Sequence, residues 1–424
     1  MNGGLSMVEM KSGYKMTEVG VIPEDWEVKN VSESCLIKAR IGWQGLKKSE
    51  YMSSGDYLLI TGTDFDNGQV NWKSCAYVSK ARYEQDSNIK IRPQDILISK
   101  DGTIGKVAYL GMIPKAGTLN SGIFVIRAND RKIDQVYLSK IFMSFYFEEF
   151  LNRLVAGSTI NHLYQKDFVK FCFPLPNSEE QVAIATALSD VDSLISALTK
   201  KIEKKKAIKQ GLMQQLLTGK KRLPGFNDKW KSMLLGDIAE VKDGTHQTPK
   251  YVKSGGKPFY SVENVTADDF KNVKHISLEE HKALTSNYRI EKGDVLMTRI
   301  GSIGCCKYVD WDVDASFYVS LALLKINEKY DSKFISYLSN IKSFKEEVML
   351  NSLVFAIPQK INLGNISLIK VYIPTSKAEQ TAIANILSDC DSEIAELEEK
   401  RDKYKEIKQG MMQQLLTGKI RLIK

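Results

Sequence analysis

The feature that most constrains the fold of this 424-residue chain is an internal repeat. Residues 180–223 and 379–422 align without a gap at a shift of 199, and 29 of the 44 positions are identical. The same shift relates 95–105 to 294–304, where the apolar pattern and both glycines persist but most other residues differ. Because a repeat decides architecture before any local pattern does, the chain is interpreted as two halves, each a divergent part followed by a nearly identical part.

Each nearly identical part is predicted to be one long helix. A proline and a capping box starting at Ser178 or Ser376 precede it, and a glycine stop at Gly219 or Gly418 follows. About 40 residues without proline give a helix of ~60 Å at 1.5 Å per residue. Hydrophobic residues step by four and three, which is the a/d seam of a coiled coil. The predicted helix-pair core is Ile184, Leu188, Val191, Ile195, Leu198, Ile202, Ile383, Leu387, Cys390, Ile394 and Leu397.

Charge predicts how the two helices pair. The first carries a lysine cluster within 200–206, and the second carries glutamates within 393–399, followed by cations within 400–405. Antiparallel pairing brings opposite charges together, whereas parallel pairing sets lysines against cations. The alternative is that these charges are merely solvated, since surface pairs contribute only ~0–1 kcal/mol. The twofold relation between the halves also favours the antiparallel pair.

The divergent parts are predicted to be α/β domains over 14–176 and 220–374, and the helices to occupy 177–219 and 375–418. Each domain has enough residues for its own core. The sequences DGTIG and IGSIG read as tight turns between two strands; a phosphate cradle is the less favoured alternative, because neither phosphate-loop motif is completed. The expected strands are 57–61, 95–99, 106–110, 122–127, 168–173, 257–261, 294–298, 317–326 and 367–373, with amphipathic helices at 136–154 and 333–350.

The sequence contains no recognisable catalytic constellation. Walker-type GK[ST], HExxH and GxSxG motifs are absent, and so is the (N/D)PP(Y/F) motif of amino-methyltransferases. Six scattered cysteines without CxxC favour free thiols and no metal site. Asp95 and Lys100 have the spacing of a nuclease carboxylate–lysine pair, but Ile98 stands where a second metal-binding carboxylate is needed. The net charge of +9 permits a polyanionic partner. No membrane span or secretory signal is expected, which favours the cytoplasm.

From about Tyr14 to its end, the sequence resembles the specificity (S) subunit, HsdS, of type I restriction–modification systems. The resemblance is carried by Gly20-Val-Ile-Pro-Glu-Asp-Trp26 at the start and by Asp243-Gly-Thr-His-Gln-Thr-Pro249 at the opening of the second divergent part. The Glu-Gln-x-x-Ile-Ala openings and Met-Gln-Gln-Leu-Leu-Thr-Gly-Lys endings of both helices complete it.

The resemblance implies two target recognition domains related by pseudo-twofold symmetry and separated by a pair of long antiparallel helices. It implies double-stranded DNA and two methyltransferase (M) subunits as partners, joined by restriction (R) subunits. S-adenosylmethionine, ATP and Mg belong on those partners, with no cofactor on this chain. Each domain would read one half of a split, asymmetric site, and the helices would act as a ruler. Domains entering the major groove on one face imply half-sites about one turn, ~10 bp or ~34 Å, apart.

Candidate DNA contacts are polar and basic residues in loops or at strand ends, where binding residues tend to lie. For each one, the alternative is an ordinary solvated loop residue; His246 in particular could face DNA or cap its own loop. The candidates are Lys38, Arg40, Gln44, Lys47, Lys48, Lys100, Thr159, Asn161 and His162 in the first domain and Thr245, His246, Gln247, Thr248, Lys250, Arg299, Gln359 and Lys360 in the second.

Three functions compete. The favoured one is a non-catalytic DNA-specificity subunit. A structural adaptor or anti-restriction decoy would hold M subunits without reading sequence, and would bind DNA weakly with a steep salt dependence. A metal-dependent nuclease would centre on Asp95 and Lys100 and on their counterparts Asp294 and Arg299; the arginine at the lysine position disfavours it.

Overall fold

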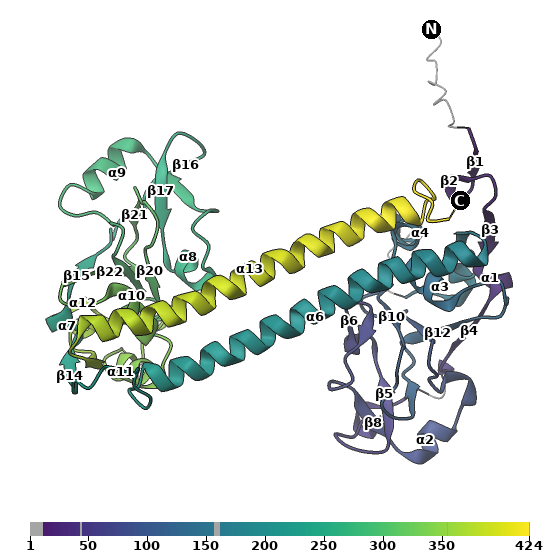
Figure 1. Cartoon of the computed structure of the whole chain (residues 1–424), viewed down its shortest axis with the longest axis horizontal. Helices are drawn as coiled ribbons and strands as arrows, with labels where there is room; N and C mark the ends of the chain where they lie inside the picture. Colours follow the sequence, from purple (N-terminus) through teal and green to yellow (C-terminus); the bar gives the residue numbers. More distant parts are fainter. Residues whose placement is uncertain (1–11, 43–44, 157–161, 354, 424) are drawn as a thin grey trace, which may run out of the picture. The chain divides into compact units, whose positions relative to one another are not determined.

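The computed structural model describes residues 12–42, 45–156, 162–353 and 355–423. The chain divides into two units (Figure 1). Unit 1 comprises residues 1–198 and 400–424, and unit 2 comprises residues 199–399. Each unit therefore combines one divergent domain with the start of the long helix that follows it and the end of the other long helix.

Unit 1 is organised around a four-stranded antiparallel sheet of order β10-β9-β12-β4. The apolar strand β9 (Ile96–Ser99) is buried along its whole length. Successive side chains of a strand point to opposite faces, so Ile96 and Ile98 enter one hydrophobic core while Leu97 enters another. Helices cover the first face, including the start of the first long helix, and a smaller sheet of order β11-β5-β8 covers the second.

The strands of unit 1 are β1 (Tyr14–Thr17), β2 (Gly20–Pro23), β3 (Glu27–Asn30), β4 (Cys35–Ala39), β5 (Tyr57–Ile60), β6 (Phe65–Asp66), β7 (Gln69–Val70), β8 (Ala76–Val78), β9, β10 (Val107–Tyr109), β11 (Gly117–Leu119), β12 (Ile123–Ala128) and β13 (Cys172–Leu175). Its helices are α1 (Val31–Ser34), η2 (Lys48–Glu50), η3 (Gly62–Asp64), α2 (Lys80–Glu84), η4 (Ser87–Ile89), α3 (Gln135–Phe142), α4 (Phe145–Ala156) and α5 (Gln165–Phe168).

Unit 2 repeats this plan with a sheet of order β15-β22-β19-β20 and a second sheet of order β16-β18-β17-β21. In β19 (Val295–Thr298), Val295 and Met297 enter the hydrophobic core that the sheet shares with the helices, and Leu296 enters the core between the two sheets. The remaining strands are β14 (Trp230–Leu234), β15 (Ala239–Asp243), β16 (Tyr251–Val252), β17 (Lys257–Tyr260), β18 (Lys274–Ile276), β20 (Cys306–Tyr308), β21 (Ser316–Phe317), β22 (Leu321–Ile326) and β23 (Lys370–Pro374). The helices are α7 (Leu235–Ile238), α8 (Val262–Ala267), α9 (Leu278–Leu284), α10 (Ser332–Leu338), α11 (Lys342–Leu350) and α12 (Leu363–Ser367).

Several sequence predictions of elements need correction. The run 317–326 is two strands in different sheets, because β21 pairs with β17 whereas β22 pairs with β15 and β19. Each expected amphipathic helix is a pair of helices, α3–α4 and α10–α11. Each expected final strand begins later than predicted, because a short helix, α5 or α12, occupies its first residues.

The two glycine turns were predicted correctly. They connect the antiparallel pairs β9–β10 and β19–β20. Gly102 and Gly105 have φ of +69° and +82°, and Gly301 and Gly304 have φ of +83° and +86°. This left-handed backbone favours glycine at all four positions.

The long helices are α6 (Ser178–Leu216) and α13 (Lys377–Leu415), each of 39 residues or about 58 Å. Their antiparallel pairing is confirmed within each unit. In unit 1, Ile184 near the start of α6 shares a core with Leu415 at the end of α13. In unit 2, Leu216 at the end of α6 shares a core with Ile383 near the start of α13.

Ion pairs follow the same antiparallel order. Lys205 and Lys206 of α6 bind Glu393 and Glu398 of α13, at 2.7 and 2.6 Å. Of the predicted seam, the structure buries Ile184, Leu188, Leu198, Ile202, Ile383, Leu387 and Ile394, and half-buries Val191, Ile195, Cys390 and Leu397.

The helix starts differ from the predicted capping boxes. At α6 the cap is Asn177, whose side-chain oxygen accepts from the Glu180 amide at 2.9 Å, and not Ser178. At α13, Ser376 accepts from the Glu379 amide at 3.4 Å, but the Glu379 carboxylate turns away to bind Arg222. The two residues expected to close the boxes bind other segments instead: Glu379 binds Arg222, and the Gln181 side-chain amide bonds to the backbone of Lys132 and Asp134.

A buried glutamate near the start of each long helix binds an arginine that follows the end of the other long helix. In unit 1, both oxygens of Glu180 accept from Arg421, at 2.6 and 2.7 Å, and one accepts from the Trp26 indole at 3.0 Å. Figure 1 shows the C-terminal end beside β1 and β2, where the Tyr14 hydroxyl donates to the Gly418 carbonyl at 2.8 Å. In unit 2, Glu379 binds Arg222 at 2.6 and 2.8 Å. The end of one helix is thus tied to the start of the other in each unit.

Within the part of the chain that the structure describes, α6 alone is long and apolar enough to span a membrane, with an 18-residue window of mean hydropathy 1.4. No such span was expected from the sequence. Ile184 and Leu188 of this helix lie in the hydrophobic core of unit 1, and Asp192 binds Lys140 and Lys408 at 2.7 and 2.6 Å. The core helix of a globular protein passes the same test, so this window is weak evidence for a membrane.

Candidate nucleic-acid interface

In unit 1, the turn after β9 meets the loop before α5. The Leu163 amide donates to the Lys100 carbonyl at 2.8 Å, and Asp101 pairs with the His162 ring. The Lys100 ammonium lies 5.3 Å from the Phe124 ring centroid, a cation–π distance. The structure therefore brings together Lys100 and His162, two candidates that lie far apart in the sequence.

Unit 2 builds the same junction from different side chains. The Ile361 amide donates to the Arg299 carbonyl at 2.9 Å, as Leu163 does to Lys100. The Gly301 amide donates to the Gln359 carbonyl at 2.8 Å, which places Gln359 and the exposed Lys360 beside the β19–β20 turn. Arg299 thus corresponds to Lys100, and Lys360 to His162.

The loop after β15 joins this junction through Asp243. One carboxylate oxygen pairs with Arg299, and the other lies 2.7 Å from Nε2 of His246. Arg299 is only 8% exposed, and its Nε has no partner among the described residues. The Tyr288 hydroxyl donates to the Asp243 carbonyl, and burial followed by the charge of Asp243 raises the pKa of Tyr288. Asp243 therefore holds the exposed His246 ring beside a buried guanidinium. The candidate Arg299 is bound within the protein, so it positions His246 and is not itself a DNA contact.

The rest of this loop is polar and accessible. Gln247, Thr248 and Lys250 are exposed and Thr245 is half-buried. The Thr248 hydroxyl lies 3.4 Å from the Tyr318 hydroxyl. Gly244 approaches the Tyr318 backbone so closely that a Cβ would lie 2.4 Å from its carbonyl, so no other residue fits there without a shift. The loop presents hydroxyl, amide, imidazole and ammonium groups, which are the donors used for phosphates and base edges.

One first-domain candidate needs correction. Arg40 is 2% exposed, and its guanidinium donates to the Leu119 carbonyl at 2.8 Å and to Thr118 at 3.1 Å. Burial, followed by the charge of Arg82, lowers the pKa of Arg40. Its donors already serve the protein interior, so we no longer treat it as a DNA contact.

The other first-domain candidates remain predictions. Lys38 is half-buried on β4, and Lys47 and Lys48 are exposed at the start of η2. Gln44, Thr159 and Asn161 lie outside the described residues. Sequence reasoning missed Asp101, Asp243 and Tyr318. A usable signal existed for Asp243, three residues before His246 in the same motif, whereas Tyr318 is 70 positions from its partner Thr248.

The nuclease centre weighed from the sequence is occupied by protein groups. One oxygen of Asp95 accepts from Arg127 at 2.6 Å, and the other accepts from Arg127 at 2.8 Å and from the Arg92 amide at 2.8 Å. Its counterpart Asp294 binds Lys325 at 2.9 Å. Within the described ranges no group of three or more His, Cys, Asp or Glu is placed to hold a metal ion.

The cysteines are free thiols, as predicted. Burial raises the pKa of Cys35 and of Cys306 to about 12, and burial together with Asp64 does so for Cys75. These three thiols are therefore protonated at neutral pH and are not nucleophiles.

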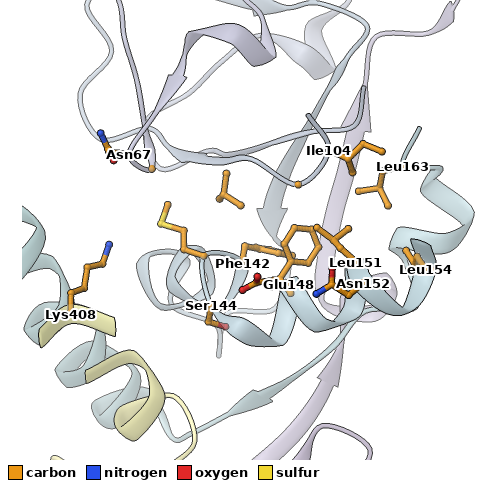
Figure 2. A pocket seen from close by; sticks show the side chains of 15 residues that line it. Asn67, Ile104, Phe142, Ser144, Glu148, Leu151, Asn152, Leu154, Leu163 and Lys408 are labelled. Carbon is orange, nitrogen blue, oxygen red and sulfur yellow. The ribbon is translucent and has the colours of Figure 1, made fainter. Parts of the chain in front are cut away.

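A pocket of about 530 Å³ in unit 1 has an apolar floor (Figure 2). Phe142, Leu151 and Leu163 line it, with Asn67 at one edge and Lys408 at another. The Lys408 ammonium already binds Asp192 at 2.6 Å. The Ser144 hydroxyl, which also lines the pocket, donates to the Ile141 carbonyl at 2.7 Å.

Fold and loops together define a duplicated recognition protein, with two related α/β domains that present different polar loops on the same framework. A profile described as "Type I restriction modification DNA specificity domain" matches residues 23–210 and 227–409. The chain belongs to this family and is a specificity subunit of a type I restriction–modification system.

Similar proteins and solved structures agree with this family assignment. The type I restriction enzyme MjaVIII specificity subunit of Methanocaldococcus jannaschii is 27% identical, over 95% of this chain and 94% of that protein. The type I S subunit of M. genitalium has the same fold, with a TM-score of 0.60 and 17% identity over 92% of this chain and 96% of that one. A second structure, from work on complex assembly and conformational transition of the type I R-M system, gives a TM-score of 0.52 at 17% identity over 94% and 99% of the chains.

Proposed function

We propose that this subunit reads a bipartite, asymmetric DNA sequence, with one half-site for each recognition domain. The observation that carries this proposal is the contrast between equivalent positions. On the same backbone junction, the accessible His162 of the first domain corresponds to the exposed Lys360 of the second, and the half-buried Lys100 corresponds to the buried Arg299, which positions His246 through Asp243. Two frameworks with the same hydrogen bonds and different loop side chains would present different donors to the major groove, and hence read different bases.

The helix pair supplies the fixed distance between half-sites and the docking surface for two M subunits. Support comes from residues that stayed identical in both helices although they are exposed. Gln210 and Gln214 of α6 recur as Gln409 and Gln413 of α13. Internal packing does not explain identical exposed glutamines, whereas a partner that binds both ends in the same way does.

Catalysis belongs to the partners in this proposal. The M subunits carry S-adenosylmethionine and methylate DNA, and R subunits carry the ATP- and Mg-dependent steps. The assembly works on cytoplasmic DNA. The occupied oxygens of Asp95 support a non-catalytic role for the first domain, since a carboxylate already bound by Arg127 offers no free oxygen to a metal.

Base-resolved mapping of DNA methylation after co-expression with its M subunit tests the function. The expected motif has two different specific halves separated by unspecified bases, centred about one helical turn (~10 bp) apart. The variant Lys360→Ala should weaken binding or relax one half of the motif, while His162→Ala should act on the other half. A palindromic or uninterrupted motif would refute two-domain reading. Weak binding with a steep salt dependence and no preferred site would instead identify a structural adaptor or decoy.

A further inference from the structure

Unit 2 contains a groove of about 1270 Å³ between the end of α6 and α11. Met213, Gln214 and Thr218 line it on the α6 side. Met349 and Leu350 line it on the α11 side and are 40% and 78% exposed. An apolar groove that leaves a leucine largely in water marks an interaction site more often than an ordinary surface.

The equivalent helix of unit 1 is polar at the same positions. Leu151 of α4 lies against the turn glycine Gly105, and Val348 of α11 lies against its counterpart Gly304. By this correspondence, Asn152 and Arg153 of unit 1, both exposed, are equivalent in position to Met349 and Leu350 of unit 2. In the same alignment, Tyr146 of unit 1 is equivalent to Ser343 of unit 2. Tyr146 is only 6% exposed, whereas Ser343 is exposed and lines the groove. Unit 2 therefore has exposed apolar side chains, and a small residue, where unit 1 has polar surface and a buried ring.

The two walls differ in origin. The α6 wall belongs to the nearly identical segments: its Gln210 and Met213 recur in α13, and its Thr218 recurs as Thr417, two residues after α13 ends. The α11 wall belongs to the divergent domain. A partner that recognises the repeated helix end would therefore meet an additional apolar wall only in unit 2.

The rim of the groove is basic. Lys220 and Lys345 are exposed, and neither makes an ion pair with the residues that the structure describes. Lys342 lies 3.4 Å from Glu346, so that pair is close to neutral. An occupant that complements this site carries an apolar stripe flanked by carboxylates, the pattern of an amphipathic helix bound in a groove.

We propose that the groove binds an acidic amphipathic helix of one M subunit, with its apolar side chains against Met213, Met349 and Leu350 and its carboxylates beside Lys220 and Lys345. This inference rests on the proposed docking of M subunits and specifies one contact within it. The M subunit bound at unit 2 is held more tightly by this contact than the one bound at the repeated helix end of unit 1.

The decisive variant installs the residues of unit 1, by replacing Met349→Asn and Leu350→Arg together. Both positions are on the surface, so folding should be preserved, which circular dichroism checks. Titration with the purified M subunit, followed by native mass spectrometry, should show one of the two binding steps weakened about tenfold or more, because two apolar side chains lose their burial. Leu278→Arg on α9, which replaces another exposed leucine of unit 2 outside the groove lining, is the matched control and should leave both steps unchanged.

A second variant tests the charge. Lys220→Glu with Lys345→Glu should weaken the same binding step, and the effect should diminish at high salt. Hydrogen exchange of the wild-type complex should show protection over residues 340–350, which the apolar double variant loses. Unchanged affinities and exchange in both variants would overturn the proposal. Self-association of the chain alone, abolished by the apolar variant, would assign the groove to a second copy and also overturn it. Failure of the wild-type chain to bind any M subunit would instead refute the proposed function.

Discussion

The buried glutamates at the helix starts yield a quantitative prediction. Replacing Arg421→Ala removes the donor of two bonds to Glu180, whose side chain is fully buried. Breaking a buried ion pair by deleting one partner costs about 3–5 kcal/mol. The Arg421 side chain is 30% exposed, so water partly replaces it, and the Trp26 indole still donates to Glu180. We therefore expect a loss of about 2–3 kcal/mol.

Unit 2 provides the internal comparison. Arg222→Ala likewise strips Glu379 of two bonds, but the indole nitrogen of Trp230 makes no bond with any described residue. The Arg222 side chain is as exposed as that of Arg421, at 30%, but Glu379 would keep no such donor, so the loss should exceed that of Arg421→Ala. Arg421 also binds the exposed Asp25, at 3.0 and 2.7 Å, but a surface pair of this kind contributes only ~0–1 kcal/mol. The indole contacts therefore decide the order of the two variants, with Arg222→Ala the more damaging.

Hydrogen exchange measured by mass spectrometry resolves the two units, whereas a global melt would mix them. Peptides covering residues 178–190 report on unit 1, and peptides covering 377–389 report on unit 2. Lysine at either arginine position is the control: it keeps the charge but loses the bidentate geometry, so its effect should be intermediate. Exchange free energies within about 0.5 kcal/mol of wild type in both alanine variants, or a reversed order, would refute the reasoning.

Four further outcomes follow from other contacts. Arg40→Met should destabilise unit 1 by about 1–3 kcal/mol, because buried carbonyl and hydroxyl groups lose their donor, and it should leave the methylated motif unchanged; thermal melts and motif mapping check this. Gly244→Ala should disturb the loop that carries His246 and weaken DNA binding in a gel-shift titration, whereas the same change at Gly364, which has open space around it and no left-handed backbone, should leave DNA binding unchanged. Lys140 and Lys408 lower the pKa of Asp192 below 3.8 against the opposing effect of burial, so its stabilisation is present above pH ~4 and is lost as the pH falls through the lowered pKa. Asp192→Asn should remove that part of the acid dependence, measured by exchange at the start of α6. Deleting one heptad from each long helix shortens it by about 10 Å and should shorten the motif spacer by about 3 bp or abolish assembly; an unchanged spacer would refute the ruler.

The long helices and the glycine turns could be predicted because their causes are local. A 3.5-residue apolar period specifies a seam wherever it occurs, and a glycine-bounded turn between two apolar runs specifies a hairpin. The break within 317–326 could not be predicted. Phe317 and residues 321–324 are apolar and buried, and no Pro or Gly separates them. Only the partner strands, which come from distant parts of the chain, decide that they belong to different sheets.

The candidate site shows the same limit. Loop position and residue type identified Lys100, His162, Arg299 and Lys360, which the fold assembles into equivalent junctions. They could not distinguish Arg40, because its carbonyl partner, Leu119, is 79 positions away. A buried arginine and a DNA-facing arginine look alike until the acceptor is known. Prediction of a site from sequence is thus reliable for where loops meet and unreliable for which side chains point outward.

Near-identity of the two helices has two separable causes. The buried pair Glu180 and Glu379, with the arginines that bind them, is identical because each unit must tie a helix start to a helix end, and no partner is needed to explain it. Exposed Gln214 and its counterpart Gln413 have no such internal reason. Only this exposed, repeated face bears on docking, and it would hold partners with equal strength at both ends. In the proposed docking, a difference between the ends must therefore come from divergent segments such as α11, and the apolar surface at Leu350 would make the proposed assembly asymmetric.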